Sequence, residues 1–112
     1  MRKLCFALFL ALASPLAAQE VIGEYDHVVK VNVGSDGLLY IAVRGNFGPQ
    51  HPCSNRAFAV SAHPLSDERT KAWLQISNAS FLARAKVNVW TNGCQGGGNS
   101  GNPVMTKMQI VQ

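Results

Sequence analysis

Residues 28–44, VVKVNVGSDGLLYIAVR, decide the fold of this chain because they describe two strands joined by a tight turn. Valine alternates with polar residues in the first half, and Leu39, Ile41 and Val43 alternate in the second. A period of two residues is typical of a half-buried strand. The segment 34–37 (GSDG) between them supplies glycines for a turn with positive φ. The stretch therefore predicts a β-hairpin with strands at 27–33 and 38–44.

Three further strands and one helix are expected after the hairpin. Alternating apolar residues predict strands at 56–62, 86–90 and 105–111. Ser66 can cap a helix, and small and apolar residues recur at intervals of three and four from Ala72 to Ala83. We therefore expect a helix at 66–84. Loops rich in Gly and Asn at 45–52 and 91–103 separate these elements.

The expected order of elements is strand-strand-strand-helix-strand-strand, so the protein is mainly β with one helix. Short strands with a single helix do not make a parallel α/β sheet. A five-stranded Greek-key barrel with a helix between its third and fourth strands, the OB-fold, has this order. We therefore expect residues 19–112 to form a single OB-fold domain.

The N-terminus has the three parts of a secretory signal peptide. Arg2 and Lys3 are basic, residues 4–13 form a short apolar run, and residues 14–18 lead through small side chains to cleavage after Ala18. The apolar run is too short for a membrane span, which needs roughly 20 residues. We therefore expect residues 1–18 to be a bacterial signal peptide and the mature protein to be periplasmic or secreted, with no membrane span.

The charge balance gives little support to nucleic-acid binding. Ten Lys and Arg face six Asp and Glu, a formal net charge of +4, and charged residues make up 14% of the chain. Arg2 and Lys3 leave with the signal peptide, so the net charge of the mature chain falls to +2. Single-stranded nucleic acid is a ligand of some OB-folds, but binding it needs a stronger basic surface.

The cysteines predict one disulfide. Cys5 lies in the signal peptide, so Cys53 and Cys94 remain as an even pair in an oxidising compartment. A metal or redox pair would need C-x-x-C spacing or neighbouring His ligands, and the three histidines are scattered. We therefore expect a disulfide between Cys53 and Cys94, with no metal site and no cofactor.

The sequence offers few candidates for catalysis. Asp67 and Glu68 lie at the expected helix start, where the helix dipole and capping explain them. No G-x-S-x-G motif precedes a helix. The glycine run at 96–98 lacks the Lys-Ser/Thr pair of a phosphate-binding P-loop. We therefore predict no catalytic residues and no enzyme activity.

Several short stretches in the second half of the chain match one known family. They are Ser61-Ala62-His63, Ala85-Lys86-Val87, Val89-Trp90-Thr91-Asn92 and Asn102-Pro103. They resemble the B subunits of bacterial AB5 toxins of the cholera toxin and heat-labile enterotoxin type, over about half of the mature chain and with a gap in the helix. Those subunits are OB-folds that assemble in rings of five and bind host glycans. A Cys53–Cys94 pair is more similar to the subtilase-cytotoxin and pertussis-like branch.

The resemblance implies a glycan site. It implies that Trp90 stacks on a sugar, that Asn92 hydrogen-bonds the sugar and that His63 lies beside the site. A sugar packs its C–H face on an indole and needs amide or carboxylate partners for its hydroxyls. The acidic residue of the family's third strand and the Lys after its Trp-Asn pair have no counterpart, because Ala57 and Gly93 stand there. A packing role for Trp90, in the barrel or between subunits, is the other interpretation.

The leading hypothesis is therefore an exported, non-enzymatic binding module for a glycan or glycoprotein. On the family pattern it forms a homo-oligomer, a pentamer, with a toxin A subunit as a further partner. The alternative is a small periplasmic structural or protein-interaction domain of the same fold with no glycan ligand.

Overall fold

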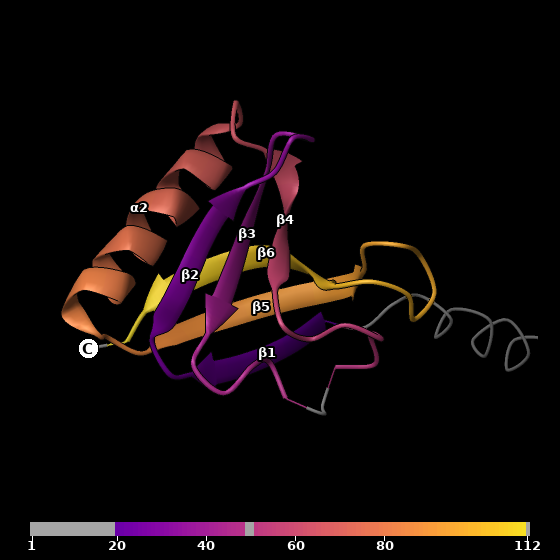
Figure 1. Cartoon of the computed structure of the whole chain (residues 1–112), viewed down its shortest axis with the longest axis horizontal. Helices are drawn as coiled ribbons and strands as arrows, with labels where there is room; N and C mark the ends of the chain where they lie inside the picture. The colour runs from indigo at the N-terminus through magenta and orange to yellow at the C-terminus, as the bar shows by residue number, and fades with distance from the viewer. Residues whose placement is uncertain (1–19, 49–50, 112) are drawn as a thin grey trace, which may run out of the picture.

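The computed structural model describes residues 20–48 and 51–111, so the expected signal peptide lies outside the described residues. The described chain forms one mixed six-stranded sheet with one helix against it (Figure 1). The strands are β1 (Glu20–Tyr25), β2 (Val28–Val33), β3 (Leu38–Val43), β4 (Ala59–Pro64), β5 (Val87–Cys94) and β6 (Pro103–Ile110), and the helix is α2 (Glu68–Ala83). The described part of the protein is therefore mainly β with one helix, as predicted.

The predicted hairpin is confirmed. β2 and β3 pair antiparallel, with Asn32 opposite Tyr40. The turn closes through the Gly37 N–H, which donates to the Gly34 carbonyl at 2.9 Å, and Gly37 has a φ of 81°. A residue with a side chain rarely adopts that φ, so the glycine at 37 is needed to make the turn.

The expectation of five strands in a closed barrel is wrong. β1 is a sixth strand, and the sheet has the order β1-β5-β6-β4-β3-β2, with β4 and β6 parallel and the other pairs antiparallel. Among the described strands, β1 and β2 do not pair, so the sheet is not closed. The physical reason is the corner at Asp26 and His27, which turns the chain so that β1 pairs with β5 while β2 pairs with β3. The two edge strands are therefore consecutive in the sequence.

Gly23 interrupts the alternation of apolar residues in β1, and for this reason the residue pattern did not predict the strand. Its inward positions are Val21, Gly23 and Tyr25, and only Tyr25 is fully buried. A Cβ at position 23 would lie 2.5 Å from the Tyr25 hydroxyl, because the phenol ring lies over the glycine. The glycine therefore replaces an apolar side chain so that the tyrosine can fold back over the strand.

The helix begins and ends close to the expected residues, but its cap and its buried face differ. The N-cap is Asp67, not Ser66, and its carboxylate accepts from the Arg69 N–H at 2.8 Å. The helix ends at Arg84, which has a left-handed φ of 55°. The buried side chains of the helix are Thr70, Trp73, Ser77 and Ser80. This face is more polar than predicted because each hydroxyl has a hydrogen-bond acceptor in a backbone carbonyl.

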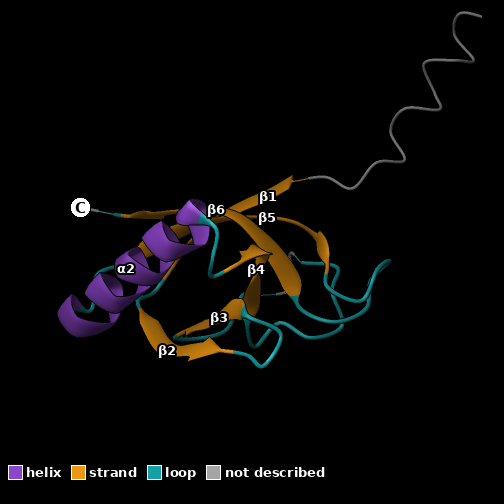
Figure 2. Ribbon diagram, turned by 90° about the horizontal axis from the view of Figure 1, so that it is seen from above, coloured by secondary structure: helices purple, strands orange, loops and turns teal. Residues whose placement is uncertain are grey.

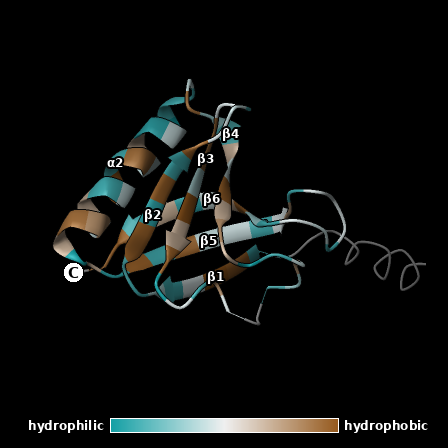
Figure 3. Cartoon of the chain, in the orientation of Figure 1, coloured by the Kyte–Doolittle hydropathy of each residue, from teal (hydrophilic) through white to brown (hydrophobic). Residues whose placement is uncertain are grey.

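The core lies between the curved sheet and α2, as the view from above shows (Figure 2). The strands contribute most of the buried apolar side chains, and hydrophobic residues recur along β3 and β5 (Figure 3). The largest of them include Leu39, Ile41, Phe47, Val89 and Met105. No helix in residues 20–48 and 51–111 has the length and apolar character needed to cross a membrane.

The predicted disulfide between Cys53 and Cys94 is confirmed, with a Cα–Cα distance of 5.6 Å. It joins the loop before β4 to the end of β5, which runs past the expected end at Trp90. The loop before β4 is also hydrogen-bonded to the loop after β5, because the Ser54 N–H donates to the Asn99 carbonyl at 2.7 Å. The bridge therefore holds two segments together that are far apart in the sequence.

Candidate functional site

Trp90 lies on the outer face of the part of the sheet formed by β1, β5 and β6. Val89 and Thr91 on either side of it are buried, whereas Trp90 itself is half-buried and Asn92 is exposed. Successive side chains of a strand point to opposite faces, so Trp90 and Asn92 share the outer face. The alternation of burial along β5 therefore indicates that the indole points away from the core.

The strand register sets charged and apolar neighbours beside the indole. Ile22 of β1 and Lys107 of β6 lie directly opposite Trp90 on its two sides. The Lys107 ammonium stands 4.6 Å from the centroid of the Trp90 ring. A cation over an exposed ring contributes only about 0.5–1 kcal/mol, so the lysine can leave the ring at small cost. The indole face is therefore covered by a side chain that a ligand could displace.

Further hydrogen-bonding side chains lie next to Trp90 on the same face of the sheet. Glu20 of β1 lies opposite Asn92. The Thr106 hydroxyl lies 3.3 Å from both a Glu20 carboxylate oxygen and the Trp90 carbonyl, either of which can accept its one proton. The outer face thus combines an indole, an amide, a carboxylate and an ammonium. These are the groups that a sugar ring and its hydroxyls require.

Glu20 and Lys107 were not among the predicted site residues. The sequence offers no acid on the third strand and no Lys directly after Trp90-Thr91-Asn92. The sheet instead brings a carboxylate from β1 and an ammonium from β6 to the same face. Only the strand register could have found these residues, since Glu20 and Thr106 are 86 positions apart.

His63 is not brought into this group. It lies near the end of β4, and β4 pairs with β3 and β6 but not with β5. Its carbonyl accepts from the Ser61 hydroxyl at 2.7 Å and from the Thr70 hydroxyl at 2.9 Å. Within the described residues it has no hydrogen bond to Trp90 or Asn92. The structure therefore gathers two of the three predicted glycan-binding residues on one face and leaves His63 beside the start of α2.

His51 is buried, with 1% of its surface exposed. Its Nε2 lies 2.8 Å from the Tyr25 hydroxyl and its Nδ1 lies 3.3 Å from the Thr91 hydroxyl. Burial lowers the pKa of His51 below its usual value, and the nearby Arg56 charge lowers this pKa further. The neutral imidazole therefore ties the loop before β4 to β1 and β5.

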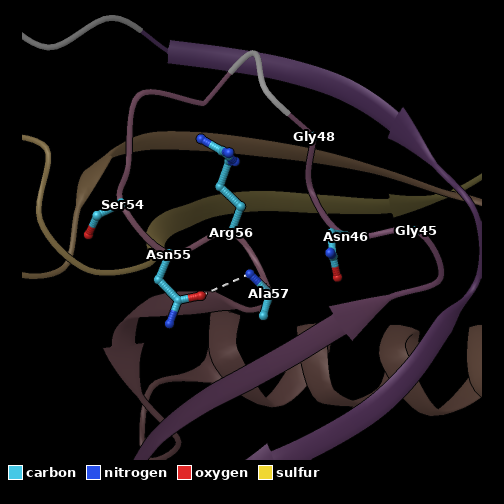
Figure 4. A pocket seen from close by; sticks show the side chains of 7 residues that line it. All are labelled: Gly45, Asn46, Gly48, Ser54, Asn55, Arg56 and Ala57. Atoms are coloured by element: carbon cyan, nitrogen blue, oxygen red, sulfur yellow. Dashed lines mark hydrogen bonds between the residues drawn. The ribbon is translucent and has the colours of Figure 1, made fainter.

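A shallow hollow of about 390 Å³ lies over the same loop (Figure 4). The Asn55 side-chain oxygen accepts from the Ala57 N–H at 3.0 Å, and the Arg56 side chain extends away from Asn55. The Arg56 guanidinium donates to the carbonyls of His51 and Cys53 at 3.4 and 3.5 Å. The Arg56 guanidinium therefore stabilises the loop through these hydrogen bonds and does not indicate a ligand site.

Asp67 and Glu68 do not form an acid–base pair. Both Asp67 oxygens accept from the Arg69 guanidinium, at 3.0 and 2.9 Å. The Arg69 guanidinium and backbone N–H lower the pKa of Asp67 to about 2. Glu68 pairs instead with Lys71 at 3.3 Å. In the part of the chain that the structure describes, no group of three His, Cys, Asp or Glu side chains could hold a metal ion.

Comparisons with protein-family models, curated proteins and solved structures give no match to this chain. Functional proposals therefore depend on the chemistry of the surfaces described above.

Proposed function

We propose that this protein is an exported, non-enzymatic glycan-binding module, similar to the B subunits of bacterial AB5 toxins. The observation that carries the proposal is the outer face around Trp90. There the indole is half-exposed, and the Lys107 ammonium lies 4.6 Å from the centroid of its ring. The side chains of Asn92 and Glu20, which lie opposite each other on β5 and β1, are on the same face. The C–H face of a sugar would replace Lys107 over the ring, and its hydroxyls would bond to the amide and the carboxylate.

The strand order supports the relation to the OB-fold. Leaving out β1, the strands follow the order β2-β3-β4-β6-β5, with α2 inserted between β4 and β5 in the sequence. We interpret β1 and β2 as the two halves of one long first strand, bent at Asp26 and His27. On this interpretation the strand order is that of the OB-fold, while the sheet itself stays open.

A single site of this kind is weak, so the proposal includes a homo-oligomer. One exposed ring and a few hydroxyl contacts bind in the millimolar range, about −4 kcal/mol. Several sites on one assembly raise the apparent affinity about 10²–10⁴-fold without any new contact. A ring of five, as in the toxin family, would provide this avidity, and a toxin A subunit would be its further partner.

A glycan array tests the proposal, using the mature oxidised protein and two variants. Trp90→Ala should lose the array signal at least about tenfold, because the stacking surface is removed. Phe81→Ala is the matched control, since it truncates an exposed aromatic ring on α2 and should leave the signal unchanged. The absence of any glycan signal, or an equal signal for Trp90→Ala, would contradict the proposal.

Light scattering after size exclusion then decides between the two function classes. A mass near five subunits supports the toxin-like ring. A monomer favours the alternative of a periplasmic protein-interaction domain with no glycan ligand. That alternative is itself supported by the exposed apolar side chains of Phe81 and Leu82.

A further inference from the structure

A groove runs between β2 and the C-terminal half of α2. In Figures 1 and 2 the helix lies alongside this strand. Two adjoining hollows of about 800 and 310 Å³ share Val29 and Phe81 in their walls. The groove is on a different part of the molecule from Trp90, and the proposed glycan site does not use its residues.

One wall of the groove is a free sheet edge. Among the described residues, β2 is the last strand of the sheet and pairs only with β3. The Gly34 N–H donates to the Leu38 carbonyl, so the even-numbered residues of β2 exchange hydrogen bonds with β3. The backbone N–H and C=O groups of Val31 and Val33 therefore point toward the free edge. Such an edge can accept an added strand.

The other wall of the groove carries exposed apolar side chains. Phe81 is 49% exposed and Leu82 is 79% exposed at the end of α2. Val29 faces Phe81 across the groove and is also exposed. Contiguous apolar surface next to polar groups is typical of a protein-interaction site.

The rim of the groove is cationic. Lys30, Arg44 and Arg84 line it, and no Asp or Glu is among its described lining residues. Arg44 pairs with Asp26 at 3.1 Å. Lys30 and Arg84 take part in no ion pair within residues 20–48 and 51–111. Two positive charges thus remain available to a ligand.

We propose that this groove binds an extended, acidic peptide segment of a partner protein. The segment adds to the free edge of β2 through the backbone groups of Val31 and Val33. An apolar side chain of the segment packs on Phe81, and its carboxylates pair with Lys30 and Arg84. Strand addition with side-chain anchoring is an established mode of peptide recognition.

Charge favours this occupant over a second copy that pairs symmetrically through the same edge. A symmetric β2-to-β2 pairing would place the same patch against itself. Lys30 and Arg84 of both copies would then meet, and like charges across an interface are unfavourable. An acidic segment neutralises the same two groups.

The test measures fluorescence anisotropy with a labelled peptide of about eight residues in which Glu and Leu alternate, a typical strand length. Two control peptides accompany it. One carries Lys in place of Glu, and the other is N-methylated at alternate amides so that it cannot pair with the strand edge. We expect saturable binding of the acidic peptide, at least about tenfold tighter than either control.

Three variants locate the binding. Lys30→Glu and Arg84→Gly should each weaken binding about tenfold or more, and the glycine suits the left-handed backbone at position 84. Lys71→Gln removes an exposed charge outside the groove and should bind as the wild type does. Melting temperatures no lower than that of the wild type show that the fold of the first two variants is intact.

Three results would overturn the proposal. The first is equal affinity for the acidic and the basic peptide. The second is equal affinity for the N-methylated peptide. The third is a mass above the monomer in light scattering that Phe81→Asp reduces to the monomer, which would show that a second copy occupies the groove. The peptide results do not involve the Trp90 face, and an oligomer formed through the groove would overturn the peptide proposal while leaving the glycan proposal standing. The two proposals therefore fail independently.

Discussion

Ser80 joins three segments of the fold, and its replacement by Ala tests that junction. The side chain is fully buried on α2. Its Oγ accepts from the Val28 N–H at 2.9 Å and donates to the Ala85 carbonyl at 2.7 Å. Ser80→Ala leaves both backbone groups without this partner. A buried polar group that loses its partner costs about 1–3 kcal/mol, which applies to the buried Val28 N–H, and the part-buried Ala85 carbonyl should cost about 1 kcal/mol. We therefore expect a loss of about 2–4 kcal/mol in the free energy of unfolding.

Urea and thermal unfolding followed by circular dichroism measure this loss. For a domain of this size, about 2–4 kcal/mol corresponds to a fall of roughly 10–25 °C in the melting temperature. Amide exchange at Val28 should accelerate, because its N–H loses the acceptor at the corner between β1 and β2. The m-value should not change, since the variant unfolds the same surface.

Ser77→Ala is the matched control. Ser77 is equally buried on the same helix, but its hydroxyl donates to the Trp73 carbonyl at 2.7 Å, one turn earlier in α2. That carbonyl belongs to the helical hydrogen-bond ladder, so removing the hydroxyl should cost about 1 kcal/mol or less. If Ser80→Ala costs no more than Ser77→Ala, the junction does not stabilise the fold and the reasoning fails.

Three further predictions concern the loops and the end of α2. Replacing Cys53 and Cys94 together by Ala should lower the free energy of unfolding by about 4 kcal/mol, by the chain-entropy model for a separation of 41 residues. A loss below about 1 kcal/mol in urea unfolding would show that the hydrogen bonds between the loops are enough to hold them together. The pKa of His51 is lowered in the fold, so its contribution to the free energy of unfolding should be complete above about pH 6.5. At lower pH this contribution should decline by up to about 1.4 kcal/mol per pH unit. His51→Gln should flatten this pH profile, and an unchanged slope would assign the effect to other groups. Arg84→Gly should raise the free energy of unfolding by about 0.5–1 kcal/mol because of its φ of 55°, and a lower melting temperature would contradict this.

The local elements could be predicted because their signals lie within short stretches of sequence. The hairpin at 28–44 shows its period of two and its turn glycines within 17 consecutive residues. The helix shows a cap and a recurring apolar spacing, although Asp67 takes the cap that Ser66 was expected to provide. The disulfide followed from the number of cysteines left once the predicted signal peptide is set aside. None of these inferences needs contacts between distant segments.

β1 illustrates what periodicity cannot show. Its inward position at Gly23 carries no side chain, because the Tyr25 ring fills that space. The strand exists because β5 supplies its hydrogen bonds, from Glu20 opposite Asn92 to Tyr25 opposite Val87. The sheet stays open because the chain bends at residues 26–27. The alternation of apolar and polar residues does not show this bend.

The sequence by itself determined the hairpin, the helix and the disulfide. Each of these follows from spacing within a segment or from simple counting. Only the tertiary structure decided that Lys107 covers the indole, that Glu20 adjoins Asn92 and that His51 is buried. Those relations depend on the register between strands and on the packing of loops. Both are set by contacts between residues that are distant in the chain, for which a local pattern carries no signal.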